Sequence, residues 1–260
     1  MTTDLLQELL ASVEARHPVV LATVVDTDRS VPRRSGSKML VYEDGTISGS
    51  VGGGEMEARV VAESQAALVV GAPRRLHYNL VDPATGDPGV CGGAVELYLE
   101  PYMPKPTVFI VGAGHVGRAV AELASWLGQR VVIWDDRQEL VDGYQLPSGG
   151  EAVTLTGPIE QAVVDAGVDA STNVVMVTRN VALDLEILPH LLATNAPYIG
   201  LMGSQRRWAT TRQRLVDAGF DDTSLQRVTA PIGIEIEAET PTEIAVSIMA
   251  QVIARVSRAS

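Results

Sequence analysis

Apolar side chains follow two different periods in roughly the first hundred residues, which indicates that helices and strands share this part of the chain. Two segments, 4–16 and 55–68, place apolar residues at the three- and four-residue spacing of a helix. The other apolar runs are short, rich in β-branched residues and bounded by Gly, Pro or Asp, as strands are. They predict strands at 18–25, 38–42, 46–50, 74–81 and 94–100. A mixed α+β domain is therefore expected here.

After residue 107 the pattern changes to short apolar runs that alternate with amphipathic stretches. Strands are predicted at 108–111, 131–134, 152–155, 174–178, 198–202 and 227–229, and helices at 116–128, 158–166, 182–194, 205–218 and 241–257. Short buried strands that alternate with helices favour a parallel, doubly wound sheet. The predicted fold class is α/β, with an N-terminal mixed α+β domain followed by a Rossmann-like doubly wound parallel-sheet domain.

A proline-rich segment lies between the two patterns. Residues 100–106 contain three prolines, which lack the amide donor and restrict the residue before them. We therefore expect an extended linker and two domains, 1–103 and 104–260. A length of 260 residues is compatible with two small domains.

Composition and charge exclude several classes of protein. The chain has 20 Lys and Arg against 32 Asp and Glu, a net charge of −12, so clustered cations for a polynucleotide are not expected. No apolar run reaches the roughly 18 residues of a membrane span, and the N-terminal segment resembles an amphipathic helix more than a signal peptide. The single cysteine, Cys91, excludes an internal disulfide and a Cys-rich zinc site. A cytoplasmic protein that binds neither nucleic acid nor membrane is the expectation.

A glycine-rich motif follows the first strand of the second domain. Gly112, Gly114 and Gly117 form G-x-G-x-x-G between a predicted strand and a predicted helix, the arrangement that brings a pyrophosphate to a helix N-terminus. Asp135 ends the next strand, where an acid would bond a ribose hydroxyl. His115 lies inside the loop and could contact a ligand. The motif predicts binding of NAD(P) or another nucleotide; the alternative is a scaffold that keeps the loop for packing. NAD and NADP both stay open, because Asp135 favours a free ribose hydroxyl whereas Arg137 could pair with a phosphate.

A second glycine-rich turn lies in the first domain. Gly52, Gly53 and Gly54 separate a predicted strand from a predicted helix, and their amides could hold an anion such as a phosphate. The alternative is a tight turn in which Glu55 and Glu57 are favourable acids of the first helical turn.

The only thiol of the chain is flanked by glycines. Gly92 and Gly93 offer Cys91 no side-chain cover, so its thiolate could bind a soft metal or carry sulfur. A small buried apolar side chain is the alternative interpretation.

Two arginines begin the predicted helix at 205–218, where they oppose the helix dipole. Ser204 can cap this helix, and Arg206 and Arg207 in its first turn would be explained by a phosphate or a partner carboxylate. A solvated helix face with pairs inside the helix is the alternative.

These motifs together resemble the xanthine dehydrogenase accessory factor family (XdhC/CoxI) over about residues 15–255. The segments that carry the resemblance are 22–25, 30–40, 44–45, 49–57, 91–93, 95–96, 100–101, 112–117, 135–137, 202–204 with Arg206, 231–233 with Ile236 and Ala238, and 240–245. Two features depart from the family: Glu55 stands where many relatives have a second Cys, and Arg179 follows Thr178 where a His is common, although Asp184 is retained.

The resemblance implies an accessory factor that binds the molybdenum cofactor (molybdopterin) and delivers it to a xanthine dehydrogenase-like or CO dehydrogenase-like enzyme. Its partners would be the apo molybdenum hydroxylase and a sulfur-donating desulfurase, and a homodimer is the default assembly. The expected contacts are Cys91 to the metal or its sulfur, and, for the cofactor or a nucleotide, Gly52, Gly53, Gly54, Glu57, Gly92, Gly93, Gly112, Gly114, His115, Gly117, Asp135 and Arg206. An NAD(P)-dependent oxidoreductase and a nucleotide-sensing regulator are the alternatives, so enzymatic turnover stays open.

Overall fold

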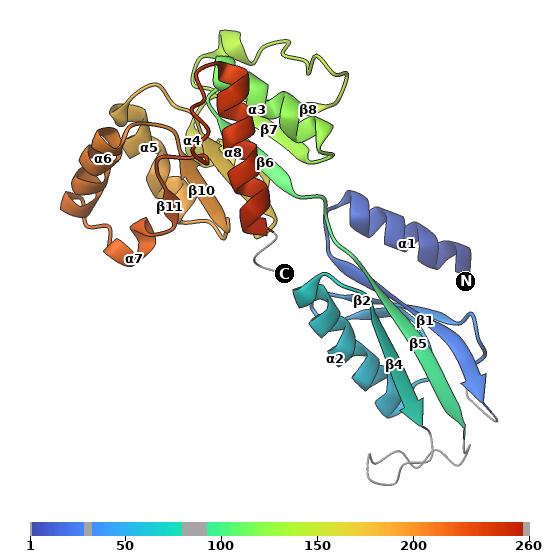
Figure 1. Cartoon of the computed structure of the whole chain (residues 1–260). Helices are drawn as coiled ribbons and strands as arrows, with labels where there is room; N and C mark the ends of the chain where they lie inside the picture. The colour runs from blue at the N-terminus through green and yellow to red at the C-terminus, as the bar shows by residue number, and fades with distance from the viewer. Residues whose placement is uncertain (1, 29–32, 80–92, 257–260) are drawn as a thin grey trace. The chain divides into compact units, whose positions relative to one another are not determined.

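The computed structural model describes residues 2–28, 33–79 and 93–256, and the chain divides after Pro104 into two compact units (Figure 1). The N-terminal unit contains an antiparallel sheet in the order β3-β2-β1-β5-β4. Its elements are α1 (Thr2–Glu14), β1 (Val19–Asp28), β2 (Lys38–Tyr42), β3 (Ile47–Gly49), α2 (Gly54–Val70), β4 (Arg74–Asn79) and β5 (Ala94–Tyr102).

One helix covers each face of this sheet (Figure 1). Alternate residues of a strand point to opposite faces, so neighbouring positions of β1 join different clusters. Val20 packs with Met56 of α2, whereas Leu21 packs with Leu5 of α1. Burial on both faces explains why β1 is a nearly continuous apolar run and not an alternating one.

The C-terminal unit is built on a six-stranded parallel sheet in the order β11-β10-β9-β6-β7-β8. Its strands are β6 (Thr107–Val111), β7 (Arg130–Trp134), β8 (Ala152–Leu155), β9 (Thr172–Met176), β10 (Tyr198–Leu201) and β11 (Val228–Thr229). Its helices are α3 (His115–Trp126), η2 (Gln138–Leu140), α4 (Ile159–Ala166), α5 (Val181–Leu192), α6 (Gln205–Asp217), α7 (Asp222–Leu225) and α8 (Pro241–Val256). None of the helices in the described ranges is long and apolar enough to cross a membrane.

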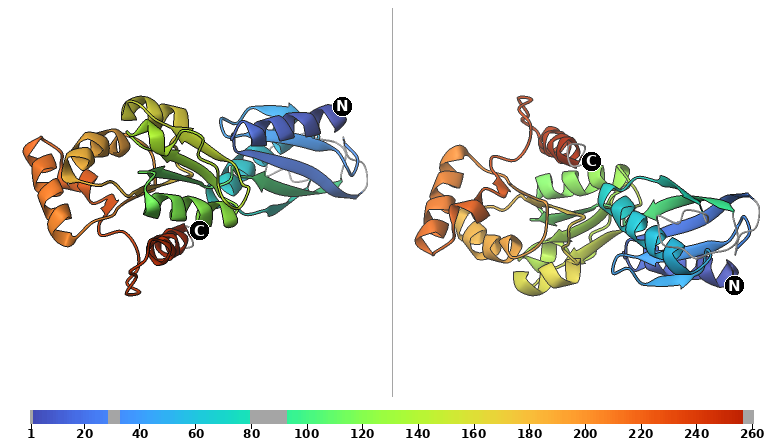
Figure 2. Two further views of the ribbon diagram at one scale, coloured as in Figure 1. Left: turned by 90° about the horizontal axis from the view of Figure 1, so that it is seen from above. Right: turned by 90° about the horizontal axis from the view of Figure 1, so that it is seen from below.

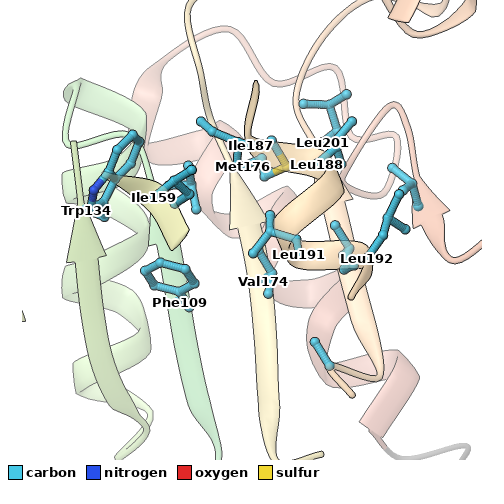
Figure 3. Packing of buried hydrophobic residues seen from close by; sticks show 14 of the residues in the cluster. Phe109, Trp134, Ile159, Val174, Met176, Ile187, Leu188, Leu191, Leu192 and Leu201 are labelled. Carbon is cyan, nitrogen blue, oxygen red and sulfur yellow. The ribbon is translucent and has the colours of Figure 1, made fainter. Parts of the chain in front are cut away.

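Helices cover both faces of the parallel sheet, as Figure 2 shows with α3 and α8 on one side and α4 and α5 on the other. Phe109 of β6 packs with Ile187 of α5 in one cluster, part of which appears in Figure 3. The next residue, Ile110, packs with Val120 of α3 and Ile248 of α8 in the second cluster. The predicted fold class is therefore confirmed.

Two details differ from the prediction. The predicted linker begins too early, because β5 continues through Pro101 to Tyr102. Beyond Leu99 this strand pairs with β1 alone, so the proline stands where one side of the ladder has no partner. The short helices η2 and α7, of 3 and 4 residues, were not predicted, because one turn carries no apolar period.

Candidate functional site

The strand order of the parallel sheet reverses between β6 and β9, and a pocket lies at the carboxyl ends of these strands. Doubly wound folds bind their ligands at such a switch point. The pocket has a volume of about 350 Å³ and is lined by Gly112, Gly114, His115, Val116, Gly117, Trp134, Asp135, Asp136, Arg137, Val177, Thr178, Arg179, Leu183, Met202 and Pro241. Five residues expected from the sequence, those of the 112–117 loop together with Asp135, meet here.

The three positions of the loop are occupied by glycine for different structural reasons. Gly112 has a φ of 120°, and a Cβ there would lie 2.8 Å from the carbonyl oxygen of Val177. A Cβ on Gly117 would collide with the carbonyl oxygen of Gly112, so the first turn of α3 packs directly on the loop. A Cβ on Gly114 would meet no described atom within 4 Å, and this residue lines the pocket. The fold requires Gly112 and Gly117, whereas Gly114 leaves open space for a ligand.

The N-terminus of α3 faces this space without an internal partner. Gly114 is its N-cap, and in the described chain no side chain accepts from the first amides and no acid stands in the first turn. Such a terminus carries free donors and a partial positive charge, which suit a phosphate. His115, the first helical residue, is exposed at the edge of the pocket.

Asp135 is only 1 % exposed and bonds within the protein. One carboxylate oxygen, Oδ2, accepts from the amide of Ala113 at 2.8 Å and from Nη2 of Arg137 at 3.1 Å. The other, Oδ1, accepts from the amide of Arg137 at 3.0 Å and from its Nε at 2.9 Å. These bonds raise the pKa of Arg137 above its ordinary value and hold the glycine loop against the end of β7. Asp135, which was expected to bind a ribose hydroxyl, is therefore the centre of a hydrogen-bond network within the protein.

A second ion pair joins the ends of β7 and β9 at the pocket. Both terminal nitrogens of Arg179 donate to the Asp136 carboxylate, at 2.7 and 2.6 Å, and they lower its pKa below the ordinary value. Arg179, which departs from the pattern of the resembled family, thus forms a charged bridge beside the pocket.

Arg207, and not Arg206, connects the elements behind the pocket. Its guanidinium donates to both carboxylate oxygens of the fully buried Asp184, at 2.8 and 2.7 Å, and to the carbonyl oxygen of Thr178 at 3.0 Å. Arg206 is exposed, does not line the pocket and has no ion pair within the described residues. Asp184 is thus the partner carboxylate that explains Arg207 in the first turn of α6. The signal that could have found it was Asp184, an acid among apolar residues of α5.

The glycine turn of the N-terminal unit already holds an anion from the protein. Oε1 of Glu57 accepts from the hydroxyl of Ser50 at 2.7 Å and from the amides of residues 51, 52 and 53 at 3.1, 3.2 and 2.9 Å. Partial burial acts to raise the pKa of Glu57, but these hydrogen bonds lower it overall. Gly52, Gly53 and Gly54 all have positive φ, which only glycine adopts readily. Two of the three amides that the sequence offered to a phosphate, those of Gly52 and Gly53, therefore have an acceptor in Glu57.

The thiol expected at the metal end is not part of the described structure. Cys91 and Gly92 lie outside the described residues, and Gly93 is buried immediately before β5. Among the described residues no three His, Cys, Asp or Glu side chains are grouped so that they could hold a metal ion.

A larger cavity, of about 720 Å³, lies elsewhere in the C-terminal unit, between α3, residues 142–148 and α8. None of the residues expected from the sequence lines it. Trp126, 77 % exposed, stands at its edge. The strand-end pocket is smaller, but it unites the predicted motif with charged groups and falls within the size range of small-molecule sites.

Comparison with known proteins gives matches to two family models. Residues 108–252 match the XdhC Rossmann domain, and residues 12–79 match the XdhC and CoxI family. A crystal structure of a xanthine dehydrogenase from Bacillus halodurans aligns with 96 % of this chain over 95 % of its own chain, with a TM-score of 0.51. The two sequences are 22 % identical over this match, and the structural likeness shows a shared fold.

Curated relatives match over much of the chain. An uncharacterised protein of Escherichia coli (strain K12), YqeB, is 33 % identical over 241 residues, which are 92 % of this chain and 44 % of that protein. The molybdenum cofactor insertion chaperone PaoD of the same organism is 23 % identical over 90 % of this chain and 82 % of its own length. A protein of Bacillus subtilis (strain 168) named as a probable xanthine dehydrogenase component is 28 % identical over 61 % of this chain and 45 % of its own length. The chain thus spans less than half the length of two of these relatives.

Proposed function

This chain belongs to the XdhC and CoxI family, and we propose that it is an accessory protein that binds the molybdenum cofactor and delivers it to an apo molybdenum hydroxylase. The relative named as a molybdenum cofactor insertion chaperone, which aligns with most of both chains, supports this role. The proposal includes a sulfur-donating desulfurase as a second partner, and a homodimer in the cytoplasm. The client is of the xanthine dehydrogenase or CO dehydrogenase class.

The observation that carries the proposal is the open space at the switch point of the parallel sheet. The Cβ side of Gly114 is open, and the first turn of α3 has no acceptor from a described side chain. A phosphate or pyrophosphate, from the cofactor or from a nucleotide, fits these donors without displacing any protein group. Gly112, Gly117 and His115 complete the loop that would hold it.

The N-terminal glycine turn has a narrower proposed role. A phosphate on the amides of residues 51–53 would have to displace the Glu57 carboxylate, so we assign the phosphate to the α3 loop. Gly53 and Gly54 meet no described atom within 4 Å on their Cβ side, which would let a flat pterin edge approach them. Arg206, expected from the sequence to contact the cofactor or a nucleotide, is exposed and does not line the strand-end pocket, and its proposed role is instead a surface contact with the client.

Cys91 is the proposed contact to the metal end of the cofactor, because Gly92 and Gly93, which follow it in the sequence, carry no side chain that could cover the thiol. A thiolate is a soft ligand and suits molybdenum or its sulfido group. When bound, the cofactor supplies the metal and sulfur chemistry of the client, and this chain holds and protects it.

The test is cofactor loading with matched variants. The chain is purified from a molybdenum-replete host as wild type, Cys91→Ala and Cys91→Ser, and molybdenum and pterin per chain are measured before an apo hydroxylase is added. We expect both variants to fold but to lose most of the bound molybdenum and of the client activation, because neither alanine nor a hard hydroxyl replaces a soft thiolate. Equal loading and activation by all three proteins would remove Cys91 from the mechanism.

The strand order also suits a dinucleotide, which keeps an NAD(P)-dependent oxidoreductase as the second candidate. Hydride transfer, followed at the nicotinamide absorbance with purified chain, separates the two. Nucleotide binding without turnover supports the accessory role, whereas turnover at a rate abolished by a bulky residue at Gly114 supports the oxidoreductase.

A further inference from the structure

Asp135, which the sequence predicts to bind a ribose hydroxyl, has its acceptor sites filled by other described residues. A carboxylate offers about four lone-pair sites. Asp135 uses four, one for the amide of Ala113 and three for Arg137, and its side chain is 2 % exposed. A ribose with two free hydroxyls would therefore have to break an ion pair before it could bind Asp135.

The guanidinium of Arg137 offers what the carboxylate does not. It carries five N–H donors in a planar fork, and Asp135 occupies only the edge formed by Nε and Nη2. Nη1 makes no hydrogen bond to any described residue, and the side chain lines the pocket and is 41 % exposed. The buried carboxylate therefore fixes the orientation of the arginine while its outer edge stays available to an anion.

The exposed part of the charged cluster is dominated by guanidinium. Arg179, 44 % exposed, lines the same pocket, whereas its partner Asp136 is 32 % exposed and Asp135 is buried. The four charges sum to zero, but the positive groups reach further into solvent. An anion arriving at this end of the pocket meets cations first.

We propose that this pocket selects a nucleotide whose ribose carries a phosphomonoester, and that Arg137 is the specificity-determining residue that binds this phosphate. Asp135 is a positioning residue that holds both the glycine loop and the arginine. The ligand class is that of NADP and other adenosine nucleotides with a phosphorylated ribose, and nucleotides with a free diol bind more weakly. This inference rests on the proposed nucleotide pocket, and it adds that the pocket discriminates between a phosphorylated ribose and a free ribose diol.

The experiment compares two probes that differ in the ribose phosphate alone. Full-length chain is titrated by calorimetry with 5′-AMP and with adenosine 2′,5′-bisphosphate. We expect the bisphosphate to bind about tenfold to a hundredfold more tightly, the range for a hydrogen bond to a charged group. In Arg137→Gln this advantage should fall to about twofold or less, while binding of 5′-AMP is kept or improved because Asp135 is released.

Arg212→Gln is the matched control. Arg212 is 43 % exposed, close to the 41 % of Arg137, and pairs with the exposed Asp222 outside the pocket. Its loss removes a paired surface arginine but should leave the bisphosphate advantage intact. Tryptophan fluorescence verifies that both variants are folded.

The outcomes separate this inference from the proposed function. Equal affinity of the wild type for the two probes, an advantage that survives in Arg137→Gln, or an equal loss in both variants would overturn the selectivity while nucleotide binding stands. Failure of both probes to bind the wild type would overturn the nucleotide pocket as well.

Discussion

Replacing Arg207 by Gln should destabilise the C-terminal unit strongly, although Arg207 is one of two adjacent arginines on a surface helix. The substitution leaves the Asp184 carboxylate, 0 % exposed, without its cation. Breaking a buried ion pair from one side costs about 3–5 kcal/mol, and because Arg207 keeps 17 % of its side chain exposed we expect the lower end, about 3 kcal/mol. In a domain of this size that lowers Tm by roughly 6–12 °C.

The assay is urea and thermal unfolding followed by tryptophan fluorescence. All three tryptophans, Trp126, Trp134 and Trp208, belong to the C-terminal unit, so the signal reports that unit alone. Arg206→Gln is the control, because the same change on the neighbouring exposed residue should stay within about 0.5 kcal/mol of wild type.

A double variant isolates the reason for the loss. Replacing Asp184 by Leu together with Arg207 by Met removes both charges, so the double variant should be more stable than Arg207→Gln. If Arg207→Gln and Arg206→Gln unfold within about 0.5 kcal/mol of each other, the network does not stabilise the fold and the reasoning is refuted.

Two further predictions concern the glycine turns. Gly117→Ala should destabilise the C-terminal unit, because its Cβ collides with the carbonyl oxygen of Gly112, whereas Gly114→Ala should unfold like wild type in the fluorescence assay and yet bind nucleotide about tenfold more weakly in calorimetry. Because the pKa of Glu57 is lowered in the folded state, its carboxylate stabilises that state at any pH above 4.5, its ordinary pKa. This contribution should be lost as the pH falls through the lowered pKa. Protection of the Gly53 amide against hydrogen exchange, corrected for the intrinsic exchange rate at each pH, should therefore fall in acid and in Glu57→Gln at neutral pH, but not in Glu55→Gln; equal protection in the three proteins would contradict the carboxylate contact.

The sequence predicted the strands of the parallel sheet, four of which, β6, β7, β9 and β10, are buried almost throughout. Each is a short apolar run between polar turns, and from 108–111 to 227–229 all six were expected close to where they lie. The sequence predicted a parallel, doubly wound sheet but not the order of its strands. The pairing of β6 with β9 joins segments about 65 residues apart, and no local period encodes such a pairing.

The parts of the site that depend on backbone geometry were predictable from the sequence. The parts that depend on ion pairs between distant side chains were less predictable. Glycines that avoid a collision, such as Gly117, leave a fixed spacing in the sequence. The partner of an arginine does not: Arg207 reaches 23 residues back to Asp184, and nothing local distinguishes it from Arg206. Long flexible side chains find acids through the tertiary fold, so charge pairing needs the structure.

The two glycine turns of the chain differ in a way that bears on which of them binds a phosphate. Buried or crowded backbone amides need acceptors, and a turn that exposes several of them is destabilised unless something accepts their hydrogen bonds. At residues 51–53 the protein supplies that acceptor itself through Glu57. At the start of α3 no described side chain does so, although an acid at the exposed position 115 would interact favourably with the helix dipole. A helix terminus left without this stabilisation, beside a glycine whose Cβ side is open, is the stronger reason to place the phosphate in the C-terminal unit.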